Sequence, residues 1–513
     1  MIGKGSQVKT RSTLALAIFS FLAAPLAAEQ FVYTDTELTE LVDHVAQEFD
    51  LQPYDVPSAD GAVPGISLLE LLPLMEYIYD LRIVTSAGEI LVGGDAAADE
   101  WGETFLLFGP AGPSLLIRGE RYDGLREIRF QGERLAPGAL EVWLGWEGNN
   151  ELKRDMGNFA RRHGIVLDAE TVPSPDTKLA AVVRARGPLP DLVMIQSSGL
   201  AALVEARAIQ ALDYLEFPLL VSQGRDAFSL DGHLWAMPFY FDTQLLFYNR
   251  DLIPSASMDG WTLERMESMA RELRDAAVGR AGGRLRGSEI RPMVWNAYSI
   301  NWLIPFQMSF GKERLVDADG RIRVDDGPTL ESLRYLIRLQ DEGLLVPMER
   351  DGMDALFVAG QVGMILSGSY AIPYFESLGL SFGVLPYPVN QDTGRDVSSL
   401  LDFKAFAMTR QTRNPVLARR MLEYLYGPGE QLRFCSELRK LSVRSDIRVV
   451  TAERSSYGEA LERTVASGTV IPPDRVYGVF KNNMWKLLRF AFSGQMAPEE
   501  TLRAGQQLMD ADR

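Results

Sequence analysis

The stretch that decides the fold of this 513-residue chain occupies residues 140–169 and reads LEVWLGWEGNNELKRDMGNFARRHGIVLDA. It begins with a short apolar strand, Leu140–Leu144, and continues through a polar loop, Gly145–Asn150. The apolar residues of Glu151–His163 recur at the spacing of one helical face, and a second strand, Ile165–Ala169, follows. Strand, helix and strand in this order predict a parallel sheet covered by helices, which is an α/β fold.

The alternation continues toward the C-terminus, with a helix over Asp176–Arg186, a strand over Leu192–Ile195 and a helix over Leu200–Ala206. Ligands of such sheets bind beyond the carboxyl ends of the strands, so the candidate ligand loops are Gly145–Asn150 and Gln196–Ser198. Similar patterns predict more elements later in the chain: helices at Trp261–Ala276, Pro328–Glu342, Asn414–Tyr426 and Val479–Phe492, and strands at Gly363–Leu366 and Phe382–Leu385.

Residues 29–138 differ from this pattern. A helical run ends at Phe49, and short strand-like pieces divided by Gly and Pro follow it. These pieces are Leu81–Thr85, Phe105–Phe108, Leu115–Arg118 and Glu127–Phe130. The region is expected to form a small accessory α+β module of about a hundred residues. Its sequence indicates no function.

The first residues of the chain have the pattern of an export signal. Basic residues precede an apolar run, Thr13–Leu26, that is short for a membrane span, and small residues Ala27 and Ala28 end it. We therefore expect residues 1–28 to be a signal peptide and the mature protein to be periplasmic, with an N-terminal membrane anchor as the alternative. No cysteine stands directly after this segment, so a lipoprotein is not expected.

The composition of the chain argues against several classes of protein function. The formal net charge of −17 argues against nucleic acid and against an anionic membrane surface as partners. Cys435 is the only cysteine, which excludes a disulfide scaffold and any multi-cysteine metal site. The 3 histidines are scattered and no phosphate-binding loop or nucleophile elbow is present, so no metal, cofactor or catalytic residue is expected. A secreted glycoside hydrolase would need a tuned pair of carboxylates, and with 69 acidic residues it stays a remote alternative.

An ordered series of motifs spans Leu140 to Met509. Its members are Val142-Trp143, Pro190–Met194, Asp231–Pro238, Tyr248–Leu252, Trp261-Thr262, Phe357–Met364, Gly368–Tyr370, Pro386 and Ile471–Pro473. In this order they resemble the extracellular solute-binding proteins of the maltose-binding type. The resemblance implies the type II periplasmic-binding-protein fold, two α/β lobes joined by hinges near Phe241–Thr243 and Val397–Phe403. It assigns residues 139–243 plus 404–455 to lobe 1 and residues 244–403 plus 456–513 to lobe 2.

The function that the resemblance implies is that of the periplasmic substrate-binding component of an ABC transporter. Such a protein, here expected to be a monomer and not an enzyme, closes its lobes on a small solute and delivers it to membrane permease subunits. A carbohydrate is the first expectation for the solute. A periplasmic ligand-sensing subunit for a membrane receptor and a polyamine-type binding protein are the alternatives.

The same resemblance supplies the candidate ligand-binding residues, which are Glu147, Asn149, Asn150, Gln196, Ser197, Asp242, Asn296, Tyr298 and Tyr370, with Asp402, Tyr477 and Trp485 as weaker additions. Carboxylates, amides and aromatic rings suit a sugar, because its hydroxyls need dense hydrogen-bonding groups and its C–H faces pack on rings.

Each candidate also has a structural alternative. Asn149 could cap a helix within a polar turn, and Gln196 and Ser197 could cap the helix that follows them. Asp242 lies in an apolar stretch where an unpaired carboxylate would be costly, so a structural salt bridge would also explain it. Tyrosines such as Tyr298 and Tyr370 could be core aromatics whose hydroxyls are satisfied.

Overall fold

A computed structural model describes residues 29–49, 51, 53–58, 61–91, 101–110, 112–117, 119–254, 258–280 and 290–512. The expected signal peptide lies outside these residues. The chain divides into two compact units: the first ends at Gly138 and includes Arg161–Gly164, and the second comprises Ala139–Ala160 and the chain from Ile165 onward. Each unit is described by itself.

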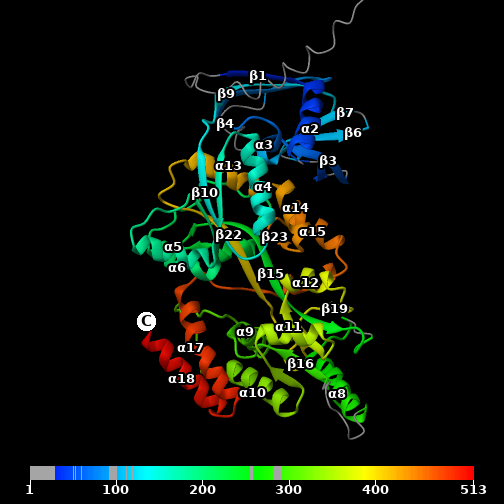
Figure 1. Cartoon of the computed structure of the whole chain (residues 1–513), viewed down its shortest axis with the longest axis vertical. Helices are drawn as coiled ribbons and strands as arrows, with labels where there is room; N and C mark the ends of the chain where they lie inside the picture. Colours follow the sequence, from blue (N-terminus) through cyan, green and yellow to red (C-terminus); the bar gives the residue numbers. More distant parts are fainter. Residues whose placement is uncertain are drawn as a thin grey trace, which may run out of the picture. The chain divides into compact units, whose positions relative to one another are not determined.

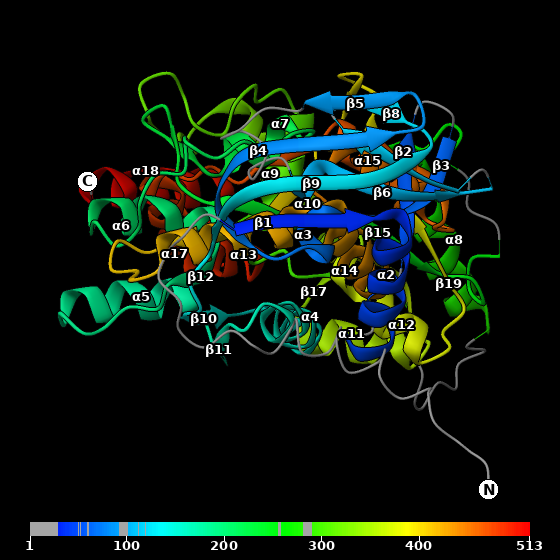
Figure 2. The ribbon, with the colours of Figure 1, turned by 90° about the horizontal axis from the view of Figure 1, so that it is seen from above.

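The N-terminal unit contains two antiparallel sheets, as expected for an α+β module. One sheet has the order β1-β9-β4-β5, and Figure 2 shows these strands side by side. The other has the order β2-β3-β6-β7-β8. The strands are β1 (Glu29–Thr34), β2 (Tyr54–Ser58), β3 (Gly61–Ser67), β4 (Met75–Thr85), β5 (Gly88–Leu91), β6 (Thr104–Gly109), β7 (Gly112–Ile117), β8 (Glu120–Tyr122) and β9 (Leu125–Arg134).

Among the described residues of this unit, two α-helices and one short 3₁₀ turn accompany the sheets. Helix α2 (Asp35–Phe49) buries Leu38, Val42 and Val45, whose spacing places them on one face. The single turn α3 (Leu68–Leu71) begins after Ser67, whose hydroxyl accepts a hydrogen bond from the backbone N–H of Glu70. The 3₁₀ turn η1 spans Trp101–Glu103.

The first lobe of the second unit is built as the sequence predicted. Strand β10 (Ala139–Leu144) pairs in parallel with β11 (Val166–Thr171) and β12 (Leu192–Gln196). Helix α4 (Asn149–Arg162) buries Leu152, Met156, Phe159 and Ala160, the face that the periodicity indicated. The remaining elements before the crossing are α5 (Pro175–Arg184), η2 (Ser197–Gly199), α6 (Leu200–Glu205), α7 (Ser222–Ala227), β13 (Ser229–Leu230) and β14 (His233–Leu234).

The second lobe has its own sheet. Strand β16 (Arg291–Trp295) pairs in parallel with β17 (Leu345–Pro347) and β18 (Val362–Gly368). The other elements are α8 (Leu263–Arg280), α9 (Ile300–Ser309), α10 (Gly327–Asp341), α11 (Arg350–Val358), η3 (Ser369–Ala371), α12 (Ile372–Ser377), β19 (Phe382–Leu385), β20 (Val389–Asn390) and β21 (Arg395–Asp396).

Two long strands join the lobes and run side by side through the second unit in Figure 1. Strand β15 (Met237–Asn249), every residue of which is buried, pairs with β22 (Leu400–Met408) as far as Thr243. From Gln244 onward it pairs with β18 instead. The Ser399 hydroxyl lies at this change of partner, 2.7 Å from the Thr243 hydroxyl oxygen, and accepts a hydrogen bond from the Gln244 backbone N–H. The crossing therefore coincides with the segments that the resemblance implied as hinges.

The chain after β22 contributes to both lobes. Strand β23 (Leu441–Ser442) pairs with the first-lobe part of β15, and β24 (Thr469–Val470) pairs with the start of β22. The helices are α13 (Pro415–Tyr426), α14 (Pro428–Leu438), α15 (Ser445–Glu453), α16 (Gly458–Ala466), α17 (Arg475–Phe492) and α18 (Pro498–Ala511). Across the residues that the structure describes, every helix is too short or too polar to cross a membrane.

Candidate functional site

Several predicted residues share one face of the sheet where the lobes meet. Gln196 on β12 lies opposite Lys404 on β22, which in turn lies opposite Tyr240 on β15. Asp402 lies opposite Asp242 in the same pair of strands. Directly opposed residues of antiparallel strands project to the same face, and so do residues two apart on one strand. The crossing strands therefore gather these side chains into one polar row.

The loop after β10 brings a further carboxylate to this face. Trp146 has φ of 61° and Gly148 has φ of 80°, so the chain turns sharply before α4 begins. A Cβ on Gly148 would lie 2.4 Å from the Leu438 side chain, so the close approach of this loop to α14 requires glycine. The turn leaves the Glu147 carboxylate 3.5 Å from the Nζ atom of Lys440.

Lys440 also forms the central ion pair of the site. Its Nζ atom donates hydrogen bonds to both carboxylate oxygens of Asp242, at 2.8 and 3.1 Å. The Ser369 hydroxyl, from the second lobe, donates to the Asp242 Oδ1 atom at 2.8 Å. Asp242 thus has the salt bridge that the sequence analysis left open, and it connects both lobes through one carboxylate.

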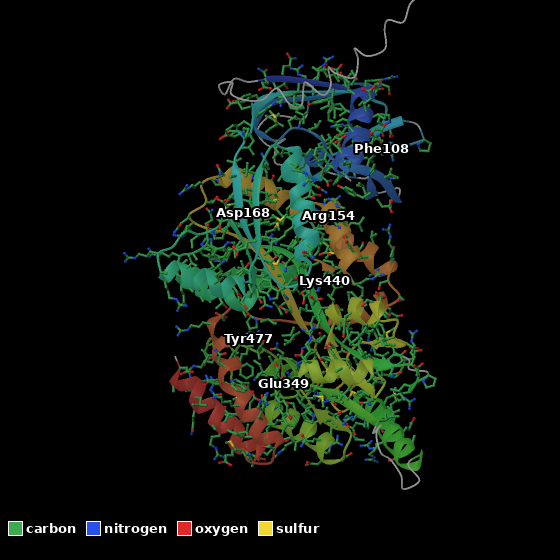
Figure 3. All side chains as sticks on the ribbon, in the orientation of Figure 1. Phe108, Arg154, Asp168, Glu349, Lys440 and Tyr477 are labelled. Carbon is green, nitrogen blue, oxygen red and sulfur yellow. The ribbon has the colours of Figure 1, made fainter. Side chains whose placement is uncertain are left out.

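A second ion pair lies beside the first. The Lys404 Nζ atom is 2.7 Å from Asp402 Oδ2, and the Gln196 amide donates to the same oxygen at 3.5 Å. We call Glu147, Gln196, Asp242, Asp402, Lys404 and Lys440 the crossing-strand cluster. Figure 3 labels Lys440 in the upper of the two lobes and Glu349 and Tyr477 in the lower.

The electrostatics of the cluster favour charged side chains in spite of burial. Burial disfavours the Asp242 carboxylate, but the charges of Lys440 and Lys404 and the hydrogen bond from Ser369 outweigh it and lower its pKa. Burial likewise opposes the Lys440 ammonium, and Asp242 and Glu147 together raise its pKa. Burial first, and then the neighbouring carboxylates, raise the pKa of Tyr240 well above its ordinary value. Asp242 and Lys440 therefore stay charged at neutral pH although both are buried.

Other predicted residues surround Arg489 in the second lobe. The Asn296 amide donates to the Glu349 carboxylate at 2.9 Å, and Glu349 is ion-paired with Arg489. The Arg489 guanidinium lies 4.8 Å from the ring centre of Tyr298 and 5.7 Å from that of Trp485. We call Asn296, Tyr298, Glu349, Trp485 and Arg489 the Arg489 cluster.

Tyr370 belongs to neither cluster, but it lies next to Ser369 in the sequence and contacts Arg350. It follows Ser369, the partner of Asp242, and the Arg350 guanidinium lies 4.3 Å from its ring centre. Burial raises the pKa of the Tyr370 hydroxyl, and the Arg350 charge partly opposes this. Because Arg350 is adjacent to Glu349 at the start of α11, one helix end contacts Tyr370 and the Arg489 cluster together.

Besides Tyr370, four predicted residues belong to neither cluster. Asn149 starts α4, and its amide donates to the Trp146 carbonyl at 2.8 Å. Asn150 is exposed, and Ser197 is buried. Within the described part of the chain, neither the Ser197 hydroxyl nor the Asn149 side-chain carbonyl has a hydrogen-bond partner. Tyr477 is buried inside the second lobe, where its hydroxyl donates to Asn301 Oδ1 at 2.6 Å and burial raises its pKa.

Sequence reasoning missed the cations of both clusters, Lys404, Lys440 and Arg489, and also Arg350, which packs on Tyr370. A signal existed for Lys404, because a lysine within the apolar run Leu400–Met408 needs a buried carboxylate as partner, the argument that was applied only to Asp242. Among the described residues, no group of three or more His, Cys, Asp or Glu side chains is placed to hold a metal ion.

Comparisons with known proteins agree with this architecture. A galactooligosaccharide-binding protein of Bacillus subtilis (strain 168) is 22% identical over 342 residues, which are 63% of this chain and 75% of that protein. A maltodextrin-binding protein of the same strain is 20% identical over 240 residues, 44% of this chain and 54% of that protein.

Solved structures share the fold. The maltose/maltodextrin-binding domain MalE of Bdellovibrio bacteriovorus, bound to maltotriose, matches with a TM-score of 0.63 at 16% identity over 73% of this chain and 99% of that one. The GacH receptor of Streptomyces glaucescens matches with a TM-score of 0.63 at 18% identity over 74% of this chain and 98% of that one. The two-lobed fold that the motif order implied is confirmed.

The family model described as bacterial extracellular solute-binding protein matches residues 156–448, more than half of the chain. This span contains both crossing strands and all the residues of the crossing-strand cluster except Glu147. The chain belongs to the family of bacterial extracellular solute-binding proteins.

Proposed function

We propose that this protein captures a carbohydrate at the crossing-strand cluster and delivers it to the membrane permease of an ABC transporter, and that it catalyses no reaction. Relatives named for galactooligosaccharide and maltodextrin binding support a sugar as the ligand class. A structural neighbour holds maltotriose, which supports the same class.

The observation that carries this proposal is that two of the three carboxylates in the cluster are each paired with a lysine. Asp242 is paired with Lys440 and Asp402 with Lys404, each at hydrogen-bonding distance. A neutral ligand disturbs neither pair, whereas a polyamine would compete with both lysines for the carboxylates. Paired ammonium, carboxylate and amide groups offer donors and acceptors together, which suits hydroxyls that also donate and accept.

Capture of a ligand requires the two lobes to rotate relative to each other, and the crossing strands are where this rotation can occur. Strands β15 and β22 join the lobes, and the hydrogen bond from Ser369 to Asp242 connects one lobe to the other. A rotation about Thr243 and Gln244, where β15 changes partner, would change the approach of the lobes while each sheet stays intact. In this mechanism the open form predominates without sugar, and bound sugar stabilises the closed form.

Several further assignments belong to the same proposal. Residues 1–28 are an export signal, the mature protein is a periplasmic monomer without a lipid anchor, and residues 29–138 are an accessory module. Residues 139–243 plus 404–455 and residues 244–403 plus 456–513 are the lobes. The family is extracellular in bacteria, which supports export.

A thermal-shift screen of the mature chain tests the ligand class. The panel contains mono- and oligosaccharides, polyols, polyamines and amino acids. A ligand at a hundred times its Kd stabilises the fold by about 2.7 kcal/mol, which is readily seen as a higher melting temperature. A shift with sugars supports the proposal, and a shift with polyamines alone contradicts it.

A further inference from the structure

The hydroxyl of Tyr240 is a buried polar group without a partner. Tyr240 lies on β15 and is 0% exposed. Among the residues that the structure describes, none forms a hydrogen bond with its hydroxyl oxygen. A buried hydroxyl loses its hydrogen bonds to water, and without a replacement this loss destabilises the fold, so native structures rarely retain such a group. The hydroxyl of Tyr240 therefore needs an explanation other than folding.

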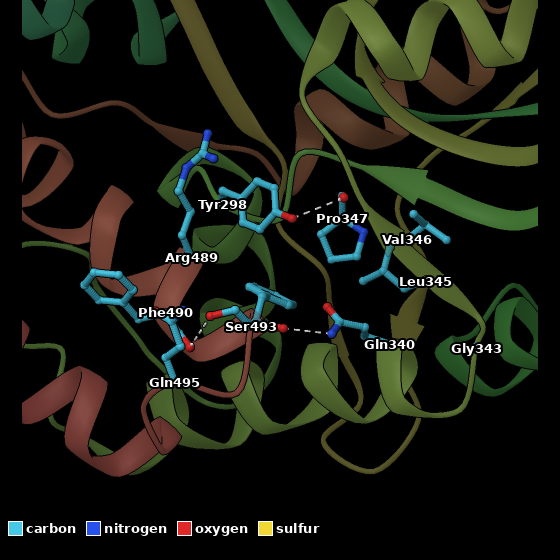
Figure 4. A pocket seen from close by; sticks show the side chains of 11 residues that line it. Tyr298, Gln340, Gly343, Leu345, Val346, Pro347, Arg489, Phe490, Ser493 and Gln495 are labelled. Atoms are coloured by element: carbon cyan, nitrogen blue, oxygen red, sulfur yellow. Dashed lines mark hydrogen bonds between the residues drawn. The ribbon is translucent and has the colours of Figure 1, made fainter.

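The packing of Tyr240 requires its ring and not its hydroxyl. The ring centre lies 5.3 Å from that of Phe434 and 5.8 Å from that of Phe239. A phenylalanine would make the same ring contacts. Figure 4 shows the opposite case in a second-lobe cavity between α10, β17 and α17, where the Tyr298 hydroxyl donates to the Pro347 carbonyl at 3.3 Å. Tyr298 thus uses its hydroxyl within the fold, whereas that of Tyr240 has no such use in the described part of the chain.

Tyr240 lies in the row of side chains that forms the proposed sugar site. It is directly opposite Lys404 on β22, whose ammonium lies 5.9 Å from the centre of the Tyr240 ring. The Lys440 ammonium lies 5.2 Å from the same centre. Both ammonium groups are engaged with carboxylates, Lys404 with Asp402 and Lys440 with Asp242. Tyr240 therefore adjoins the crossing-strand cluster but takes no part in either of its ion pairs.

The Tyr240 hydroxyl keeps its proton and can donate it. Burial is the main cause that raises its pKa well above the ordinary value, and the carboxylates of Asp242, Glu147 and Asp402 raise it further. Because Tyr240 is fully buried, a ligand group that reaches the hydroxyl has to be small. A single sugar hydroxyl has this size, and it can accept the hydrogen bond that the phenol donates.

We propose that Tyr240 is a specificity-determining residue of the sugar site, whose hydroxyl donates a hydrogen bond to one hydroxyl group of the bound sugar. Binding then supplies the partner that the fold does not. A sugar that lacks this hydroxyl group leaves Tyr240 buried and unpaired in the complex as well, so the protein discriminates against it. The proposal rests on the proposed function, because it concerns the same ligand at the same site.

Calorimetric titration of the full mature chain with maltotriose, galactotriose and the monodeoxy derivatives of each tests this contact. Tyr240→Phe should bind the parent sugar about tenfold more weakly than the wild type does, which is about 1.4 kcal/mol. One monodeoxy derivative should bind the wild type about tenfold more weakly than its parent sugar, because it leaves the Tyr240 hydroxyl unpaired. The same derivative and its parent should bind Tyr240→Phe equally well, since the variant has no hydroxyl to pair.

Thermal unfolding of the ligand-free protein separates a ligand contact from a structural one. Tyr240→Phe should melt no lower than the wild type, because the hydroxyl that it loses has no partner in the fold. Tyr426→Phe is the matched control: Tyr426 is a buried tyrosine of the same lobe, and its hydroxyl donates to the Pro218 carbonyl at 2.5 Å. This control should melt lower than the wild type and bind sugar with unchanged affinity.

Three results overturn the role of Tyr240 alone. They are a lower melting temperature of Tyr240→Phe, an affinity of this variant for the parent sugar equal to that of the wild type, and monodeoxy derivatives that weaken binding equally in both proteins. Failure of the wild type to bind both trisaccharides and every other sugar of the thermal-shift panel overturns the proposed function, and the Tyr240 contact with it.

Discussion

The Nζ atom of Lys440 lies 2.8 Å from Oδ2 of Asp242, and the two side chains are 2% and 3% exposed. The ammonium of Lys440 and the carboxylate of Asp242 are therefore both buried at the place where the lobes join. Such a pair contributes little net stability, because desolvation offsets the attraction, but neither partner can be removed alone without a large cost. The pair therefore fixes the geometry of the crossing strands.

Lys440→Met should leave the Asp242 carboxylate buried with only its weaker partners. The expected loss of unfolding free energy in the second unit is about 3–5 kcal/mol, measured by urea denaturation. The double variant Asp242→Asn/Lys440→Met should lose less than the sum of the two single losses, because neither charge is then left alone. The control is Arg323→Met, which removes surface ion pairs with Asp317 and Asp319 and should produce no measurable change. Additive losses would show that the pair is not coupled.

Stability should fall as the pH rises between about 4.5 and 7, because of Glu430. Burial raises the pKa of this carboxyl to about 7, although its oxygen accepts hydrogen bonds from Tyr424 and Arg433. The folded pKa exceeds the unfolded value of 4.5, so folding favours the protonated form and ionisation costs stability across this window. At about 1.4 kcal/mol per pKa unit, the decline is about 3 kcal/mol.

Glu430→Gln is the matched comparison for that slope. The amide cannot ionise, so its unfolding free energy should vary less with pH than that of the wild type between 4.5 and 7. Parallel curves for the two proteins, measured by urea denaturation in a buffer series, would contradict a raised pKa at Glu430.

Gly132→Ala should destabilise the N-terminal unit and spare the other. A Cβ at this position in β9 would lie 2.2 Å from the Tyr77 carbonyl oxygen, so the backbone of β4 must move. Overpacking of this kind costs about 1–3 kcal/mol. Calorimetry should show a lower first-unit transition and an unchanged second-unit transition. Gly102→Ala, where the nearest atom is 3.7 Å away, should change neither, and a shift of both transitions by Gly132→Ala would show that the units unfold together.

Tyr477→Phe separates a structural role from a ligand-binding one. The variant removes the donor to the part-buried Asn301 Oδ1, which should cost about 0.5–1.5 kcal/mol in urea denaturation. Its affinity for sugar should equal that of the wild type. Tyr374→Phe, at an exposed tyrosine, should change neither quantity. A loss of affinity without a loss of stability in Tyr477→Phe would show that Tyr477 binds the ligand.

Much of the fold could be predicted from periodicity. The helices α4, α10 and α13 begin and end within two residues of the predicted bounds, because each has one apolar face. Strand β15 could not be delimited in the same way. It is buried over its whole length, so it has no alternation, and its two halves belong to different sheets. The hinge in this strand was predicted from the order of the motifs, and the spacing of the apolar residues did not indicate it.

Strand ends indicated part of the candidate site, and the resemblance supplied the rest. Gln196, the last residue of β12, could be placed from the end of its strand, whereas the motif order supplied Tyr370, which follows β18. Lys440 lies after α14 in an irregular segment, and only tertiary packing brings it to Asp242. Ion pairs between residues 198 positions apart leave no local pattern in a sequence.

The central claim is that a sugar binds at the crossing-strand cluster, and calorimetric titration of Gln196→Ala tests it most directly. The Gln196 side chain contacts Asp402 only weakly at 3.5 Å, so its loss should leave the fold intact. With maltodextrin and galactooligosaccharide as ligands, the wild type should bind, and Gln196→Ala should bind at least about tenfold more weakly, which is about 1.4 kcal/mol. Equal affinity of the two proteins for a sugar that the wild type binds would contradict the account.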